Sequence, residues 1–170
     1  MVSFSAWALQ LGRAPDARTL ELTRRPADAE IARRLALDAG TPVFTYTRLR
    51  LLDGNPVMIE RSTFVEPIGR LLLDCDLDSG SVYQQLGELG VRFARAHQSI
   101  AATAATTHQA RLLAVPRRTP LLAVTRQVFD GAEHPIELSV DSYRSDAFAI
   151  TVDNRVAVPR AGVGLRLVSE

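Results

Sequence analysis

The sequence predicts an α+β domain in which an antiparallel β-sheet forms the core and helices flank it. Three observations carry this prediction. A helical segment, a strand, a tight turn and a second strand follow one another twice along the chain. Both copies have the alternating, strand-forming residues of a hairpin. The copies also align without a gap over the helix and the turn that follows it. The domain is therefore expected to be pseudo-duplicated, with two helix–hairpin units.

The repeat is anchored by two Thr-Pro pairs. The stretch "ARRLALDAGTPV" (32–43) lies over "ARLLAVPRRTPL" (110–121), 78 residues later. Proline biases the residue before it away from helical backbone, so each pair marks the start of a strand. An Asp-Gly turn then closes each hairpin. One unit cannot bury its apolar faces, so we expect both hairpins to pair in one sheet. Chance similarity of two ordinary hairpins is the alternative.

The other elements follow in chain order. The patterns predict a helix over 3–12, a strand over 17–27, a helix over 28–37, a helix over 80–90, a long strand over 92–105, a helix over 107–115 and late strands over 147–154 and 164–170. Asp28 is the expected N-cap of its helix. Ser81 and Gln84 have the spacing of a capping box, and Gly90 ends that helix. The alanines of 92–105 would also suit a helix.

Length and composition indicate one globular domain over residues 1–170. Hydrophobic residues make up 46% of the chain and charged residues 23%, which is ordinary for such a domain. No apolar run approaches the ~20 residues that span a bilayer, and no signal peptide is evident. We therefore expect a cytoplasmic protein without membrane contact.

Charge and metal-ligand spacing exclude other classes. The net charge of +1 gives no basic footprint for nucleic acid. Cys75 is the only cysteine, so neither an internal disulfide nor a cysteine zinc cluster is possible. The three histidines lack metal-binding spacing. There is no G-x-S-x-G motif, no glycine-rich phosphate loop and no dinucleotide fingerprint. The sequence favours binding over catalysis, and no cofactor or metal is expected.

Candidate binding residues share one face of the predicted sheet. Side chains alternate across a strand, so Arg48 and Arg50 point the same way. Guanidinium groups donate two parallel hydrogen bonds to phosphate or carboxylate, so this pair is a candidate anion clamp. Glu60 on the return strand belongs to the same face and is counted with the site. Glu137 and Tyr143 of the second hairpin suit hydroxyl or amide groups of a sugar-like molecule. An outward-facing ion pair between the arginines and Glu60 is the alternative, and the pattern alone leaves both open.

Two serines extend this site. Ser81, at a helix N-terminus, offers a hydroxyl and free backbone N–H groups. Ser5, near the start of the first helix, could offer the same. A role for Ser81 as a helix cap alone is the competing interpretation.

Three stretches together resemble the UTRA effector-sensing domain of GntR-type transcription regulators of the HutC subgroup. They are "TRLRLLDGNPVMIERS", "DSGSVYQQL" and "RQVFDGAEHPIELSVDSYRSDAF", and the resemblance covers roughly residues 3–151. It implies a chorismate-lyase-like α+β fold and a homodimer. It also implies small effectors such as phosphorylated amino sugars, other sugar phosphates or urocanate.

The resemblance further implies roles for single residues. It assigns the phosphate to Arg48 and Arg50, with help from Ser81 and from backbone amides near Phe4 and Ser5, and the sugar end to Glu137 and Tyr143. The family carries a winged helix-turn-helix domain before this one, whereas only Met1 and Val2 precede the first predicted helix. We therefore expect a fragment whose DNA binding depends on a missing N-terminal domain.

The resulting prediction is a sensor of a small anionic metabolite, a sugar phosphate or amino-sugar phosphate, that controls an attached DNA-binding domain. Strand edges after Val156 are the candidate dimer interface. Two alternatives remain at this stage: a small enzyme of the chorismate lyase type, and a dimerisation module with an empty cleft.

Overall fold

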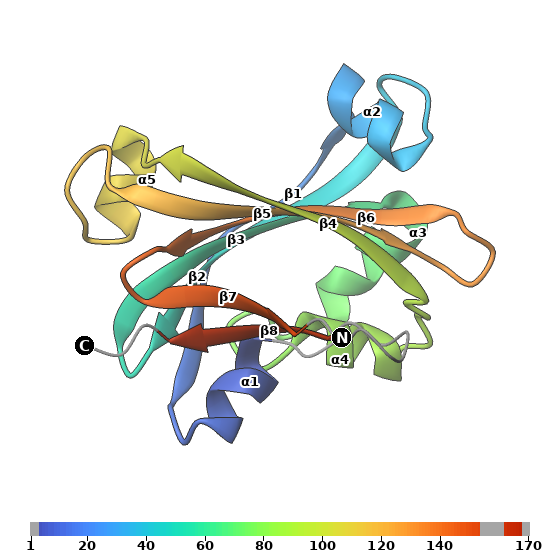
Figure 1. The fold of residues 1–170 in the computed structure, drawn as a ribbon. Helices are drawn as coiled ribbons and strands as arrows, with labels where there is room; N and C mark the ends of the chain where they lie inside the picture. Colours follow the sequence, from blue (N-terminus) through green and yellow to red (C-terminus); the bar gives the residue numbers. More distant parts are fainter. Residues whose placement is uncertain (1–3, 154–161, 168–170) are drawn as a thin grey trace.

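A six-stranded antiparallel sheet forms the centre of the domain in the computed structural model, which describes residues 4–153 and 162–167 (Figure 1). The strand order is β1-β2-β3-β6-β5-β4. The strands are β1 (Pro15–Pro26), β2 (Pro42–Leu52), β3 (Asn55–Val65), β4 (Arg95–Ala104), β5 (Pro120–Phe129) and β6 (Pro135–Arg144). A separate two-stranded sheet pairs β7 (Phe148–Asp153) with β8 (Gly162–Leu167). The predicted α+β class with an antiparallel core is confirmed.

The helices divide between the two faces of the large sheet. They are α1 (Phe4–Gln10), α2 (Ala29–Leu35), α3 (Glu66–Gly69), the 3₁₀ helix η1 (Arg70–Asp74), α4 (Val82–Glu88) and α5 (Thr107–Leu112). In Figure 1, α1, α3, α4 and the β7–β8 hairpin lie below the sheet, and α2 and α5 lie above it. No helix in the described part of the chain is long and apolar enough to cross a membrane.

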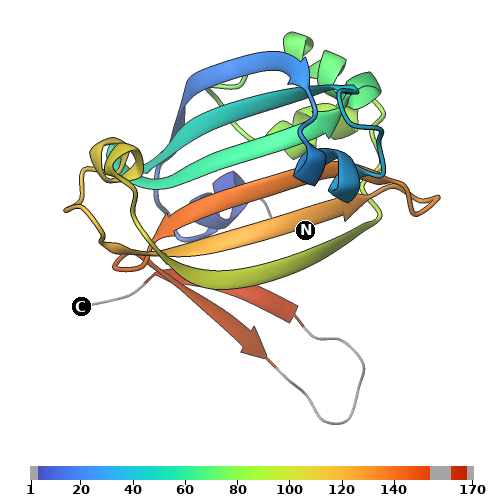
Figure 2. The ribbon, with the colours of Figure 1, turned by 90° about the horizontal axis from the view of Figure 1, so that it is seen from above.

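The two halves repeat each other in backbone detail. Ala36 and Ala114, 78 residues apart, end α2 and α5 with nearly equal left-handed φ values of 52° and 53°. Equivalent backbone hydrogen bonds close both connections: Ala27 N to Thr41 O (2.8 Å) and Ala105 N to Thr119 O (2.9 Å), then Leu37 N to Ala32 O (2.9 Å) and Val115 N to Ala110 O (3.0 Å). Figure 2 shows the halves side by side, β1-β2-β3 next to β6-β5-β4. The repeat in the sequence is therefore a repeat of structure.

The two hairpin turns differ in length. Asp53 and Gly54 form a two-residue turn with φ of 50° and 78°, which matches the twist of the flanking strands. The second turn has five residues between Phe129 and Pro135. There the Asp130 carboxylate accepts from two backbone N–H groups of the loop at 2.9 Å each. The second Asp-Gly pair therefore opens a wider loop than the sequence pattern predicted.

The helix caps agree with the sequence in part. Asp28 caps α2, accepting from the backbone N–H of Ile31 at 2.9 Å. Ser81 caps α4, accepting from the backbone N–H of Gln84 at 3.3 Å. The Gln84 side chain, however, donates to Glu88 at 3.0 Å instead of completing the predicted capping box.

The α3–η1 segment was absent from the sequence-based prediction, although Pro67 in its first turn is a typical helix-start residue. It packs closely on the sheet at Gly69, where a Cβ atom would lie 2.5 Å from Cβ of Phe44. The long strand predicted over 92–105 is confirmed as β4, and its alanines do not form a helix.

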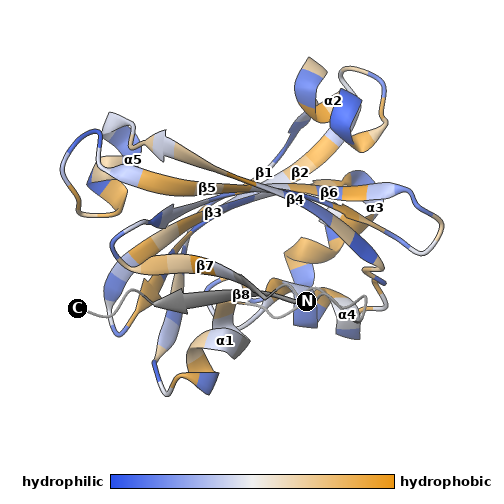
Figure 3. Ribbon diagram, in the orientation of Figure 1, coloured by the Kyte–Doolittle hydropathy of each residue, from blue (hydrophilic) through white to orange (hydrophobic). Residues whose placement is uncertain are grey.

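Apolar packing fixes α1 and α4 over one face of the sheet. Val82 and Leu86 of α4 belong to a buried cluster with Tyr46 and Phe64, whose rings stack at 6.2 Å. Ala8 of α1 belongs to a second cluster with Tyr143 and Phe148. Figure 3 shows that hydrophobic and hydrophilic residues both occur along the strands of the large sheet. These clusters hold the two helices where the polar side chains of that face lie.

Candidate anion-binding site

Charged side chains form a buried row across β2, β3 and β6. The strand register places Arg48 opposite Glu60, and Glu60 opposite Asp141. Their exposed fractions are only 2%, 9% and 3%. Buried charges of this kind persist when they are paired or meet a polar ligand. The alternative of an outward-facing surface pair is therefore excluded, because the row is buried under α1 and α4.

Both terminal nitrogens of Arg48 have hydrogen-bond partners. Its guanidinium donates to Glu60 Oε2 at 2.8 Å and to the Leu77 carbonyl at 2.9 Å. The Tyr46 hydroxyl donates to the other Glu60 oxygen at 2.6 Å. Burial acts to raise the pKa of Glu60, but the two arginines and the Tyr46 hydrogen bond outweigh burial and lower that pKa. Glu60 is therefore a carboxylate committed to Arg48.

Arg50 lies one pleat further along β2 and has a weaker set of partners. It donates to the Ser5 hydroxyl at 2.7 Å and to the Gly80 carbonyl at 3.4 Å. The Glu60 carboxylate is 3.7 Å from Arg50 Nη1. Burial, followed by repulsion from Arg48, lowers the pKa of Arg50. Two buried guanidinium groups thus share one carboxylate, and an added anion would relieve the excess positive charge.

Arg50 is covered by the first residues of α1, Phe4 and Ser5, and by Gly80 just before α4. These residues are called the roof. The Phe4 ring centre lies 4.7 Å from the Arg50 guanidinium carbon. The Ser5 hydroxyl donates to Gly80 O at 2.9 Å and so joins the two roof segments. Ser81 follows directly and is half-buried. The structure therefore places Phe4 and Ser5 against Arg50, whereas Ser81 only follows Gly80, whose carbonyl accepts from Arg50.

The second half of the site is built on β6. Glu137 Oε2 accepts from the Tyr83 hydroxyl of α4 at 2.5 Å. Burial raises the pKa of Glu137 to about 7. Arg126 on β5 lies 3.8 Å from Asp141, and burial raises the pKa of Asp141 although Arg126 opposes that shift. This half therefore carries carboxyl groups that are drawn towards their neutral form.

Glu137 and Tyr143 stand at opposite ends of the polar row on β6. They are six residues apart, about 20 Å along an extended strand. The register places Tyr143 opposite Met58, which in turn pairs with Arg50. Tyr143 therefore lies towards the Arg50 end, and Glu137 lies at the other end. The structure does not bring these two residues together at one end of a ligand.

Five buried polar atoms on this face have no hydrogen-bond partner among the described residues. They are Arg48 Nε, Arg50 Nε, Glu137 Oε1, Ser139 Oγ and Asp141 Oδ1. Leaving such an atom unpaired costs roughly 1–3 kcal/mol, and native proteins contain few of them. The unpartnered N–H donors of the arginines and the unpartnered oxygens of β6 therefore lie on the same face of the sheet. Together they match a ligand with an anionic end and a hydroxylated or amino end.

Three contributors to this site were missed in the sequence. Tyr46 lies two residues before Arg48 and so shares its face, but its bond to Glu60 was not anticipated. Arg126 lies 78 residues after Arg48, so the repeat itself could have identified it. Tyr83 reaches the sheet from α4, and no spacing rule predicts a contact between segments so far apart in sequence.

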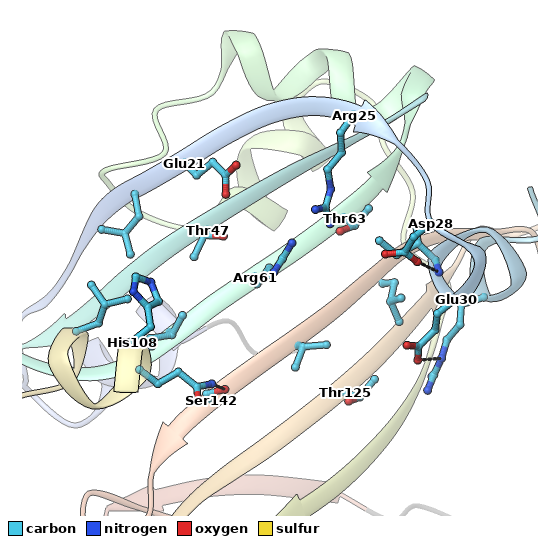
Figure 4. A pocket seen from close by; sticks show the side chains of 18 residues that line it. Glu21, Arg25, Asp28, Glu30, Thr47, Arg61, Thr63, His108, Thr125 and Ser142 are labelled. Atoms are coloured by element: carbon cyan, nitrogen blue, oxygen red, sulfur yellow. Dashed lines mark hydrogen bonds and ion pairs between the residues drawn. The ribbon is translucent and has the colours of Figure 1, made fainter. Parts of the chain in front are cut away.

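A cavity of about 740 Å³ lies on the opposite face of the sheet, between α2 and α5 (Figure 4). The strand residues that line it point away from the arginine face of the sheet. In Figure 4, Arg61 of β3 lies between Thr47 and Thr63. On the arginine face, by contrast, Arg48 and Arg50 are buried beneath α1 and α4. In the described part of the chain, no cluster of three His, Cys, Asp or Glu side chains could hold a metal ion.

Comparison with known proteins gives one consistent family. The family described as "UTRA domain" matches residues 10–149. The HTH-type transcriptional regulator GgaR of Escherichia coli (strain K12) is 26% identical over 152 residues, which covers 88% of this chain and 59% of GgaR. This chain thus spans about three fifths of the length of that curated relative.

Solved structures agree with the sequence match. The crystal structure of PhnF from Mycobacterium smegmatis has a TM-score of 0.80 at 26% identity, covering 86% of this chain and 65% of PhnF. The ligand-binding domain of a protein described as a GntR-family transcriptional regulator, from Bordetella bronchiseptica, has a TM-score of 0.71 at 32% identity. That alignment covers 78% of this chain and 84% of the other.

Proposed function

Because the chain belongs to the UTRA domain family of GntR-type transcription regulators, we propose that its buried arginine pair binds a small anionic effector. The named relatives are transcriptional regulators, so the chain is a regulatory domain and not an enzyme. This sets aside the chorismate lyase alternative. The effector itself is the subject of the proposal.

The observation that carries the proposal is the charge imbalance at Arg50. Arg48 and Arg50 are each 2% exposed and share the single carboxylate of Glu60. Among the described residues, the hydrogen-bond partners of Arg50 are a hydroxyl and a carbonyl group. A phosphate would accept from both guanidinium forks and from the Ser5 hydroxyl, with charge-assisted bonds about twice as strong as neutral ones. The anion would displace the weak Arg50–Gly80 contact.

The polar row on β6 supports a sugar phosphate or an amino-sugar phosphate in particular. Ser139, Asp141 and Glu137 each present a buried oxygen without a hydrogen-bond partner among the described residues. Hydroxyl and amino groups are the donors that satisfy such oxygens. A phosphorylated sugar carries its anion at one end and these donors at the other. Tyr143, near the arginine end, would contact the ring rather than the far end.

The proposal extends to the whole regulator. The relatives are HTH-type proteins longer than this chain. We propose that effector binding shifts the population of arrangements of a homodimer, and with it the spacing of attached winged helix-turn-helix domains on DNA. A cytoplasmic location is part of this proposal.

A thermal-shift screen of the purified chain tests the ligand class. The probes are glucosamine 6-phosphate, glucose 6-phosphate, a phosphonate, urocanate, chorismate and the two unphosphorylated sugars. A ligand at about 100 times its Kd adds about 2.7 kcal/mol and raises Tm by several degrees. We expect phosphorylated probes to raise Tm and their parent sugars to leave it unchanged. Stabilisation by urocanate alone would keep the sensor and refute the phosphate assignment.

Matched variants then locate the site. Arg50→Ala removes an arginine beneath the roof, and Arg61→Ala removes an exposed one from the cavity on the other face. We expect the first to reduce the ligand-induced rise in Tm strongly and the second to preserve it. The reverse result would move the site to the 740 Å³ cavity.

A further inference from the structure

The two edges of the six-stranded sheet differ in their protection against strand pairing. The edge strand β1 carries five charged side chains: Asp16, Arg18, Glu21, Arg24 and Arg25. Proline stands at both of its ends, and its register with β2 shifts between Thr19 and Glu21. Charges, prolines and bulges are the devices by which proteins prevent an edge from pairing with another strand. The β1 edge has all three.

The opposite edge strand, β4, has none of these devices beyond the charged Arg95 at its start. All ten of its residues are exposed, and within the described residues it pairs only with β5. The stretch from Ala96 to Ala104 contains no Asp, Glu, Lys, Arg or Pro, and its register with β5 runs without a shift. Ile100, at its middle, is 44% exposed. Figure 2 shows β4 as the outermost strand of its half, away from β1.

A long and uncharged edge presents a row of unpaired backbone N–H and C=O groups, which is a template for another strand. We propose that two copies of this chain associate through β4, edge to edge, so that their sheets join into one continuous antiparallel sheet. The proposal deepens the homodimer of the proposed function and rests on it. This interface differs from the one predicted after Val156. The earlier prediction falls on residues 154–161 and on the side chains of β8, which lie outside the described part of the chain.

A second copy of the same strand fits this edge better than an unrelated strand. Antiparallel pairing of a strand with itself about a two-fold axis is self-complementary. A two-fold axis at Ile100 places this residue opposite its own copy and sets Arg95 of one copy near Ala104 of the other. The charged end of β4, where Arg95 pairs with Glu133, then lies far from its own copy. The two exposed Ile100 side chains come close to the axis and cover each other.

The first experiment measures the mass of the chain in solution. Analytical ultracentrifugation of the native chain should show a dimer, and Ile100→Lys should weaken that dimer about tenfold or more, because like charges then meet near the axis. Leu73→Lys is the matched control, since Leu73 is a 66% exposed residue outside the sheet. Circular dichroism checks that both variants are folded. An unchanged dimer in folded Ile100→Lys overturns the proposal.

A second experiment does not depend on weakening the dimer. In a Cys75→Ser background, Ile100→Cys should form a disulfide-linked dimer under mild oxidation, because facing residues of an antiparallel pair have Cα atoms within disulfide range. Arg18→Cys, exposed on the β1 edge, should remain monomeric on a denaturing gel. Cross-linking at β1 and not at β4 overturns the proposal.

The thermal-shift assay separates this proposal from the effector. A folded, monomeric Ile100→Lys chain should still be stabilised by the phosphorylated probe, since Ile100 lies outside the arginine site. A native chain that stays monomeric at all concentrations refutes both the β4 interface and the homodimer, whatever the effector result. A dimer that forms without β4 refutes this inference alone.

Discussion

The two hairpins place an arginine at equivalent positions, yet the electrostatics around them differ. Arg48 of β2 and Arg126 of β5 are 78 residues apart. Each faces a carboxylate on a nearby strand: Glu60 for the first and Asp141 for the second. The first pair is at 2.8 Å, and the second is at 3.8 Å. The pKa of Glu60 is lowered, whereas the pKa of Asp141 is raised.

One residue accounts for much of this difference. The first hairpin has Arg50 two residues after Arg48, and the second has the fully buried Val128 two residues after Arg126. The second arginine adds a positive charge that keeps Glu60 ionised. Without such a charge, burial dominates in the second hairpin. The same backbone frame thus occurs twice, and one added arginine leaves the first half with excess positive charge while the second half holds a carboxyl group drawn towards its neutral form.

The largest predicted effect is a loss of stability in the first hairpin, which carries the arginine pair. Glu60→Gln should destabilise the domain by about 3–5 kcal/mol, because it leaves two buried guanidinium groups without a counter-charge. Urea denaturation at neutral pH measures this loss. Glu133→Gln is the control, since Glu133 pairs with Arg95 on the exposed surface and its loss should change stability little. Equal behaviour of the two variants would show that Glu60 does not hold the arginine pair.

The next effect is a pH dependence set by Glu137. Its pKa is raised from 4.5 to about 7, first by burial. The folded state therefore binds more protons than the unfolded state between these values, and stability from this group falls as pH rises from about 4.5 to 7. The full difference corresponds to about 3 kcal/mol at 1.36 kcal/mol per pH unit. Glu60 acts in the opposite sense, since its lowered pKa gives stability that is lost only as pH falls below its ordinary value.

Glu137→Gln should flatten the decline in stability over that window and make the domain more stable at pH 8 than the native chain. Thermal melts at intervals between pH 5 and pH 8 measure both effects. A steeper decline in the variant than in the native chain would contradict the assignment. Asp141, whose pKa is also raised, remains in both proteins and leaves a residual slope in each.

A smaller effect tests what the extra arginine contributes to binding. Arg50→Val gives the first hairpin the residue type of Val128. We expect phosphate-containing ligands to bind about 30-fold more weakly, which is about 2 kcal/mol for a hydrogen-bonded charge. Stability should change little, because repulsion with Arg48 disappears together with the bonds to Ser5 and Gly80. Titration calorimetry measures the affinity, and unchanged affinity would remove Arg50 from the site.

Local patterns in the sequence predicted the frame of this site. The Thr-Pro pairs, the 78-residue repeat and strand alternation correctly placed Arg48, Arg50 and Glu60 on one face of one sheet. The same alternation placed Glu137 and Tyr143 on that face. It could not show that six residues of β6 separate them, because sharing a face says nothing about distance along the strand.

The rest of the site depends on contacts between distant segments. Burial of the arginine pair under α1 and α4 follows from packing at Ala8 and Leu86, which spacing along the strands does not encode. Tyr83 meets Glu137 across 54 residues of chain. The raised pKa of Glu137 depends on that burial, so no sequence pattern could have predicted it.

The smallest predicted effect is at Asp141, and it decides whether the two halves really differ. Asp141→Asn should cost no more than about 1 kcal/mol at pH 7, because burial already favours the neutral form that asparagine imitates. Arg126 keeps its bond to Gln98 at 3.1 Å, so the substitution does not strip it of partners. Urea denaturation alongside Glu60→Gln gives the comparison directly. If the two variants lost equal stability, both hairpins would hold a committed ion pair, and the excess positive charge at Arg50 would no longer mark one end of the site for an anion.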